Sequence, residues 1–274
     1  MNDHSKIIEK ISFPTTDEYY ERTSADGYAF LGYALNKLGL NWDACLNKMS
    51  DNNFTLNADK RVRNVNVYKH TNYTYTLSFC LDFLNSINDQ ETFDKLFKIF
   101  KSIGFYKNEN LYRYCDTEIY YGVPNTTSAA AWIFALSGDI ENCQKCLNFL
   151  SSTQKQNGNW NYYNISNNKL KKLATQEDSF HIAMMVTHLR LVQSTTGIDT
   201  SPLYLKSIKM LETHNKKILD GGSIGWGIPM LYLATKGMDT NLNRRSYEGC
   251  LQSVSHKNFR VRSISAYCLT KDYN

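Results

Sequence analysis

Apolar residues recur at helical spacing through most of the chain, and the helices that they predict come in pairs. Apolar positions repeat every three or four residues across 73–87 and again across 93–105, which is the pattern of two amphipathic helices. Together these two segments predict one helical hairpin. The same pattern predicts further helices at 28–38, 127–136, 140–150, 179–192, 203–211, 226–235, 247–254 and 261–269.

The first helices of successive pairs start at regular intervals, near residues 73, 127, 179 and 226. These starts are 54, 52 and 47 residues apart, which indicates an internal repeat. The first helix of a pair is apolar on nearly all sides, as in SAAAWIFAL, whereas the second carries charges on one side, as in DIENCQKCLNFL. A helix that is apolar all round is buried, and an amphipathic helix lies outside it. We therefore predict an all-α fold, an α/α toroid with an inner and an outer ring of helices in about five to six hairpins. An open solenoid of stacked hairpins is the alternative.

The repeats begin near residue 26, so we expect one domain over 1–274, with 1–25 as an N-terminal extension. With 4 prolines and 14 glycines the chain has few of the turn residues that an all-β fold needs. The net charge of +5 comes from 31 basic and 26 acidic residues spread along the chain, which is typical of a solvated surface and not of a nucleic-acid-binding stripe.

The sequence carries no signal for a membrane, a disulfide or a cofactor. Residues 1–13 are too polar for a signal peptide, and no stretch approaches 18 apolar residues, so we expect a soluble, cytoplasmic protein that does not span a membrane. The seven cysteines lie mostly in apolar helical patterns, as reduced buried thiols do. Cys143 and Cys146 form a lone CxxC without a second pair, so we assign no metal and no cofactor.

Polar and aromatic residues gather in the loops that precede the inner helices. In a closed ring all inner helices run in the same direction, so these loops emerge at one end and share a face. They contain three of the six histidines, whereas the loops at the other end contain no histidine and no aromatic residue. The candidate site residues in them are Asp26, His70, Tyr120, Tyr121, Asn125, Glu177, Asp178, His181, Trp226, Arg260 and Arg262.

A histidine close to a carboxylate gives the clearest chemical hypothesis in this set. His181 follows Asp178 by three residues, about one helical turn, so that the carboxylate can orient the imidazole and raise its basicity. We predict His181 as the proton-transfer group. Tyr120 or Tyr121 would be the opposing acid. A core role for His181 and a helix-capping role for Asp178 or Asn125 are the structural alternatives.

The remaining candidates are predicted to bind substrate. Aromatic rings beside carboxylates and amides suit a sugar, and helix N-termini together with arginines suit an anion. We therefore expect a small-molecule or oligosaccharide substrate carrying negative charge. Three residues would stack on sugar rings, namely Trp160, Tyr162 and Trp226. Arg260 or Arg262 would bind the anion, and polar contacts would come from Asp26, His70 and Asn125.

Two stretches resemble the α/α-toroid superfamily of terpenoid cyclases and protein prenyltransferase β subunits. CLNFLSSTQKQNGNW at 146–160 resembles their repeat, in which Gln, Gly and Trp follow a helix. EDSFHIAMMVTHLRL at 177–191 resembles the prenyltransferase stretch whose histidine ligates zinc, and that histidine matches His181. The prenyltransferase zinc site also has an Asp and a Cys one hairpin earlier, where 123–131 reads VPNTTSAAA and has neither.

A closer resemblance is to toroid proteins associated with bacterial polysaccharide biosynthesis, and more distantly to uronate epimerases. It consists of a VPN loop, a Gly-x-Trp-x-Tyr turn at 158–162, an Asp-x-aromatic-His helix at 178–181, a Trp-Gly pair at 226–227 and a late Arg-bearing helix. The resemblance implies a carbohydrate-active enzyme of glycan metabolism, of epimerase, lyase or hydrolase type. An isoprenoid-diphosphate enzyme without the usual metal or aspartate motifs and a non-catalytic binding toroid are the alternatives.

Overall fold

The fold consists of a ring of helices with one small sheet attached. The structure is a computed structural model that describes residues 7, 25–51, 53–54, 73–106, 109–115, 121–166, 169–213, 227–256 and 258–273. Apart from Ile7 and Ala25, the expected N-terminal extension lies outside these residues. The helices are α2 (Ala25–Lys37), α3 (Asp43–Asp51), α4 (Thr74–Ser86), α5 (Gln90–Ile103), α6 (Pro124–Leu136), α7 (Ile140–Thr153), α8 (Ser179–Thr196), α9 (Ser201–Thr213), α11 (Gly227–Thr235), α12 (Asn241–Ser253) and α13 (Phe259–Thr270).

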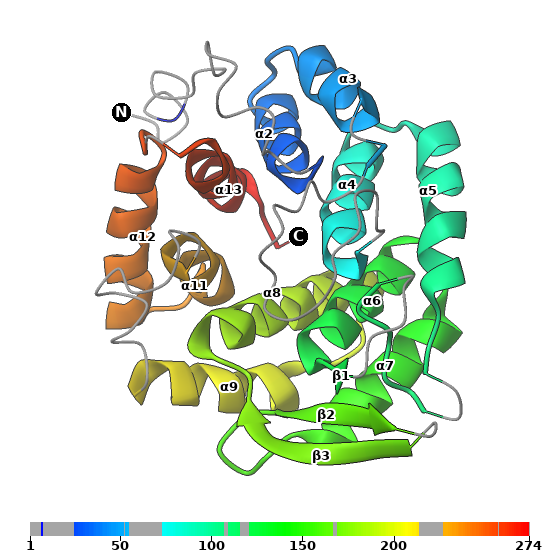
Figure 1. The fold of residues 1–274 in the computed structure, drawn as a ribbon. Helices are drawn as coiled ribbons and strands as arrows, with labels where there is room; N and C mark the ends of the chain where they lie inside the picture. Colours follow the sequence, from blue (N-terminus) through cyan, green and yellow to red (C-terminus); the bar gives the residue numbers. More distant parts are fainter. Residues whose placement is uncertain are drawn as a thin grey trace.

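Alternate helices form a closed inner ring. Helices α2, α4, α6, α8, α11 and α13 each pack against the next, and α13 packs against α2 (Figure 1). The outer helices α3, α5, α7, α9 and α12 each pack against the inner helix that precedes them. The predicted α/α toroid is therefore confirmed, and the open solenoid is excluded because the last inner helix contacts the first.

The burial of the two helices of a hairpin follows their sequence patterns. Every residue of α6 from Pro124 to Ala135 is buried, whereas α7 buries only Cys143, Cys146, Leu147, Phe149 and Leu150. Between them Gly138 turns the chain with a φ of 76°, a left-handed conformation that glycine adopts without strain. Asp139 then caps α7 by accepting a hydrogen bond from the backbone N–H of Asn142.

Helix boundaries differ from the prediction where capping residues extend a helix beyond its apolar core. Helix α6 begins at Pro124, three residues earlier than expected, because a proline suits the first turn, where its missing N–H costs nothing. Helix α8 continues to Thr196 and ends at Gly197 in the left-handed conformation. Helix α3 was not predicted, and of its residues only Cys45 and Met49 are buried, too few to give a periodic apolar signal.

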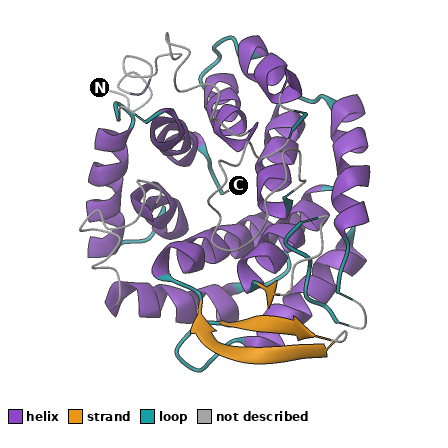
Figure 2. Ribbon diagram, viewed as in Figure 1, coloured by secondary structure: helices purple, strands orange, loops and turns teal. Residues whose placement is uncertain are grey.

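The ring also carries a three-stranded antiparallel sheet that the sequence analysis did not predict (Figure 2). Its strands are β1 (Tyr121–Gly122), β2 (Asn161–Ser166) and β3 (Lys169–Gln176), in the order β1-β2-β3. Strand β1 precedes α6 and β3 precedes α8. The sheet therefore joins the loops that lead into two adjacent inner helices.

Aromatic side chains fill the interior of the inner ring. Phe79 of α4 contacts the rings of Phe30 from α2, Trp132 from α6 and Tyr267 from α13, with centroids 4.4, 5.8 and 5.6 Å away. His188 of α8 stacks on Trp132, and burial lowers its pKa to about 3, so this histidine is neutral. His188 is therefore a core residue. No helix in the described ranges combines the length and apolar character that crossing a membrane would require.

Candidate active site

The first turns of the inner helices lie at one end of the ring and are joined by direct contacts. Arg260 at the start of α13 pairs with Asp26 at the start of α2. The backbone N–H of Asn125, in the first turn of α6, donates to the Glu177 side chain just before α8, with N and Oε1 3.0 Å apart. The segment at 112–114 bridges α4 and α6, since Tyr114 accepts from the N–H of Thr74 and the N–H of Tyr112 donates to Thr127. We call this end of the ring the rim.

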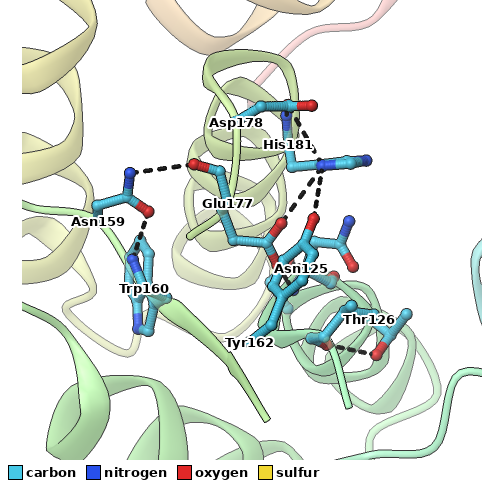
Figure 3. A network of polar contacts seen from close by, with 10 residues as sticks. Asn125, Thr126, Asn159, Trp160, Tyr162, Glu177, Asp178 and His181 are labelled. Carbon is cyan, nitrogen blue, oxygen red and sulfur yellow. Dashed lines mark hydrogen bonds and ion pairs between the residues drawn. The ribbon is translucent and has the colours of Figure 1, made fainter. Parts of the chain in front are cut away.

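A cluster around His181 occupies the part of the rim between α6 and α8 (Figure 3). The imidazole Nδ1 lies 3.3 Å from Glu177 Oε2, 3.3 Å from Asp178 Oδ1 and 3.4 Å from the Tyr162 hydroxyl. The Glu177 side chain is fully buried, whereas the Asp178 side chain is 66% exposed and that of His181 is 29% exposed. Two carboxylates and a hydroxyl group therefore surround one imidazole nitrogen of a histidine that solvent still reaches.

Glu177 is held in place by both its backbone and its side chain. Its N–H donates to the carbonyl of Trp160, and its own carbonyl accepts from the Asn159 side-chain amide at 3.0 Å. Its side chain caps α6, because Val123 at the N-cap position has no polar group to offer and the Glu177 carboxylate accepts the Asn125 N–H instead. A carboxylate at a helix N-terminus is also favoured by the helix dipole.

Asp178 is the N-cap of α8. Its Oδ1 accepts a hydrogen bond from the backbone N–H of His181 at 2.9 Å, which is the capping role weighed as the alternative. The same oxygen lies 3.3 Å from His181 Nδ1, so capping and the proximity to the imidazole occur together.

The two carboxylates favour the protonated form of His181. Burial alone would lower the pKa of His181, but the interaction of the imidazole with Glu177 and the charges of Glu177 and Asp178 outweigh it, and the pKa lies above the ordinary value of 6.5. With Nδ1 facing these groups, Nε2 is the nitrogen left to exchange a proton with a bound molecule. The arrangement suits a general acid near neutral pH.

Two of the buried oxygen atoms at the rim that accept no aligned hydrogen bond from the described part of the chain lie close to His181. They are Asn125 Oδ1 and Glu177 Oε2, and the latter has only the approach of His181 described above. Buried polar atoms normally have partners, which include water and ligands.

Asp26 and Arg260 form an ion pair on another part of the rim. The Asp26 side chain is fully buried, and its Oδ2 accepts from Arg260 Nη2. The ion pair also acts on Tyr75 at the start of α4. Burial and, to a smaller extent, the charge of Asp26 raise the pKa of the Tyr75 hydroxyl, whereas the charge of Arg260 opposes this rise. The charge of Arg260, which was expected to bind an anion, is thus balanced within the protein. Arg262 donates to the carbonyl of His256 at 3.4 Å and lies 5.5 Å from the Phe259 ring centre.

The structure corrects the expectation for Trp160. Its side chain is completely buried and its indole N–H donates to the carbonyl of Leu150 at 2.8 Å, so the ring packs the core and offers no face to a sugar. Tyr162 is partly exposed beside His181. His70, Tyr120 and Trp226 lie outside the described residues. Tyr121 pairs with Asn164 in the sheet through its backbone, and its side chain is not among those described.

The sequence analysis named Glu177 among the rim loops but gave it no role. A signal was present, because Glu177 and His181 are four residues apart at the start of a helix. Its burial and its contact with a helix that starts 53 residues earlier were not readable from the sequence.

Among the described residues no group of three or more His, Cys, Asp or Glu side chains is arranged to bind a metal ion. Cys143 and Cys146 are both buried, and burial raises the pKa of the Cys143 thiol to about 12.

Comparisons with known proteins give matches to solved structures. No protein-family model and no curated protein sequence matches the chain. The GH76A α-1,6-mannanase from Salegentibacter sp. HEL1_6 aligns with a TM-score of 0.61 and 14% identity, over 98% of this chain and 97% of that chain. An inactive variant of that enzyme in complex with α-1,6-mannotetrose gives 0.58 and 14%, covering 98% of each chain. A family 76 glycoside hydrolase from a bovine Bacteroides thetaiotaomicron strain gives 0.59 and 9%, over 98% of this chain and 76% of that chain.

At these identities the similarity concerns the fold. The protein is an α/α toroid of the architecture found in glycoside hydrolase family 76. The superfamily that the sequence motifs indicated is consistent with this result at the level of architecture. An activity does not follow from the fold, because one architecture supports many chemistries.

Proposed function

We propose that the protein is a carbohydrate-active hydrolase that binds an oligosaccharide at the rim and uses His181 as its proton donor. The observation that carries the proposal is the position of His181, whose Nδ1 lies among Glu177, Asp178 and Tyr162 while its side chain remains partly exposed. The solved structures with the same fold support the choice of substrate class, since one of them contains a bound mannotetrose.

Hydrolysis of a glycosidic bond needs a proton for the departing oxygen and a base for the attacking water. In the proposed reaction His181 Nε2 donates its proton to the glycosidic oxygen as the bond between that oxygen and the anomeric carbon breaks. Water adds to the anomeric carbon, and its proton passes to a carboxylate. Asp178 is the exposed carboxylate of the cluster and is proposed for this step. Glu177 is a positioning residue, because it is buried and acts on the substrate through His181. Tyr120 and Tyr121 stay predicted as a further acid.

A neutral sugar chain fits the rim better than the anionic substrate expected from the sequence. That expectation depended on helix N-termini together with Arg260 or Arg262, and the guanidinium of Arg260 is paired with a buried carboxylate. The exposed carboxylate of Asp178 beside His181 is a hydrogen-bond acceptor, which suits a sugar hydroxyl and would repel a carboxylate. Among the described residues, aromatic side chains fill the ring interior that an isoprenoid tail would need, which disfavours the isoprenoid alternative.

The proposal is tested by measuring the release of reducing ends from a panel of neutral and anionic oligosaccharides, including α-1,6-linked mannose chains. On any substrate that is cleaved, His181→Ala is expected to reduce kcat/KM by about a hundredfold or more, the usual contribution of a general acid. His256→Gln is the matched control, because His256 is an exposed histidine in the loop before α13. Circular dichroism and thermal unfolding verify that both variants fold.

Two results would overturn the proposal. Full activity of a folded His181→Ala variant would remove His181 from the reaction. Binding of an oligosaccharide without cleavage of any member of the panel would favour the non-catalytic binding toroid.

A further inference from the structure

A pocket lies at the end of the ring opposite the rim. It has a volume of about 430 Å³ and is lined by Arg190, Gln193, Ser194, Gly197, Tyr204 and Tyr273. This volume is within the range of small-molecule sites. Twelve residues of α8 separate His181 from Gln193, which corresponds to about 18 Å along the helix axis. The pocket is therefore separate from the candidate active site.

Arg190 is a cation of this pocket that is held by an aromatic ring and a backbone carbonyl. Its guanidinium carbon lies 3.8 Å from the centre of the Tyr273 ring, and Nη1 donates to the carbonyl of Ala234 at 2.9 Å. Within the described ranges, no carboxylate approaches it to ion-pair distance. Tyr273 is itself fixed, because its hydroxyl donates to the carbonyl of Leu233 at 2.6 Å. The carbonyl ends of α8 and α11 stabilise the guanidinium charge but leave most of its five N–H groups for another acceptor.

The other polar groups of the pocket are mainly hydrogen-bond donors. Gln193 Oε1 already accepts the backbone N–H of Thr200 at 3.0 Å, so the NH₂ end of its amide is the part left for a ligand. Ser194 and Tyr204 also line the pocket, and a hydroxyl group can donate a hydrogen bond. A pocket with one uncompensated guanidinium and several donors is complementary to a ligand that is rich in acceptors and carries negative charge.

We propose that this pocket binds a small carboxylate-bearing molecule of about the size of one sugar ring. A carboxylate matches the planar guanidinium with two parallel hydrogen bonds, which a single hydroxyl group cannot make. The proposal does not depend on the hydrolase activity, because no residue of the rim takes part in it.

The test is isothermal titration calorimetry with glucuronate, using glucose as its neutral counterpart of nearly the same shape and inorganic phosphate as an anion of different geometry. We expect glucuronate to bind at least tenfold more tightly than glucose and more tightly than phosphate. Arg190→Gln is expected to weaken glucuronate binding at least tenfold. Ser194→Asp keeps Arg190 and places a carboxylate four residues after it on the same face of α8, so it should neutralise the cation and weaken binding to a similar extent. His181→Gln locates the binding, since it should leave the affinity unchanged.

Each other outcome counts against the proposal. Equal affinity for glucose and glucuronate would show that the charge of Arg190 does not select the ligand, and tighter binding of phosphate would exclude the carboxylate assignment. Undiminished binding to a folded Ser194→Asp variant, or loss of binding in His181→Gln, would place the ligand at another site. Absence of binding by all three probes would also refute the proposal. Ser194→Asp keeps the test decisive if Arg190→Gln does not fold.

Discussion

A buried ion pair near the end of α13 gives the most quantitative prediction about the fold. Lys271 Nζ lies 2.6 and 2.8 Å from the two carboxylate oxygens of Asp82, and the Tyr267 hydroxyl donates to the same carboxylate at 2.9 Å. The side chains of Lys271 and Asp82 are only 8% and 3% exposed. Lys271 follows the last inner helix and Asp82 belongs to α4, so the pair ties the C-terminal segment to an inner helix that is not the direct neighbour of α13 in the ring.

We predict that Asp82→Asn lowers the free energy of unfolding by about 3–5 kcal/mol, because it leaves a buried ammonium group without its counter-charge. For a chain of 274 residues this corresponds to a fall in Tm of about 5–9 °C. Burial lowers the pKa of Lys271, and Asp82 opposes that shift. In the variant the pKa falls further, so Lys271 can lose its proton and the destabilisation should shrink as pH rises.

Urea unfolding of the wild type, Asp82→Asn and the double variant Asp82→Leu/Lys271→Met, each at pH 7 and pH 10, measures these effects. The double variant replaces both charges by apolar groups and is expected to lie closer to the wild type than the single variant does. A destabilisation by Asp82→Asn that is equal at both pH values, or a double variant that is less stable than the single one, would refute the reasoning, since either would mean that packing and not charge is responsible.

Three further predictions concern the rim and the turn that supports it. Glu177→Gln should move the alkaline loss of hydrolase activity to lower pH, because it removes the charge that raises the pKa of His181; an unchanged pH–rate profile would contradict this. Because the pKa of His181 is raised in the folded state, its protonation stabilises the fold fully below a pH of about 6.5, and this stabilisation is lost as pH rises through the folded-state pKa. In urea titrations, the difference in unfolding free energy between the wild type and His181→Gln should therefore be larger at pH 6 than at pH 9. A larger difference at pH 9 would contradict this prediction. Gly158→Ala should destabilise the protein by about 2 kcal/mol or more, because Gly158 has a φ of +86° and an added Cβ atom would lie 2.4 Å from the carbonyl oxygen of Lys206. A Tm of the variant within a degree of the wild-type Tm would contradict this prediction.

The ring could be predicted from the sequence because the two helix types differ so clearly in their patterns. The apolar run SAAAWIFAL of α6 has no polar side to face solvent, and its partner α7 does. The same approach missed the sheet, since LKKLATQ in β3 has no regular alternation and its pairing with β2 depends mainly on backbone hydrogen bonds. Helix α3, with two buried residues, also gave too weak a signal.

The candidate site was predictable in position but not in detail. Parallel inner helices bring the residues before them to one end, whatever those residues are, so the contact between Asn125 and the loop of His181 followed from the topology. Whether a side chain at that end faces solvent or the core depends on packing. Trp160 was expected to stack on a sugar and instead donates its indole N–H to a backbone carbonyl in the core. Arg260 was expected to be available to an anion and instead pairs with Asp26.

The position of Glu177 links the stability of the ring to the chemistry proposed for it. One carboxylate oxygen satisfies a helix N-terminal N–H of α6, and the other lies beside the imidazole on α8. The negative charge is tolerated in a buried site because the N-terminus of α6 and a protonated His181 both stabilise it. Deprotonation of His181 would remove one of these two stabilising contributions, so a buried Glu177 in turn favours a charged imidazole. The Glu177 carboxylate that links the N-terminus of α6 to α8 therefore also keeps His181 protonated at the rim.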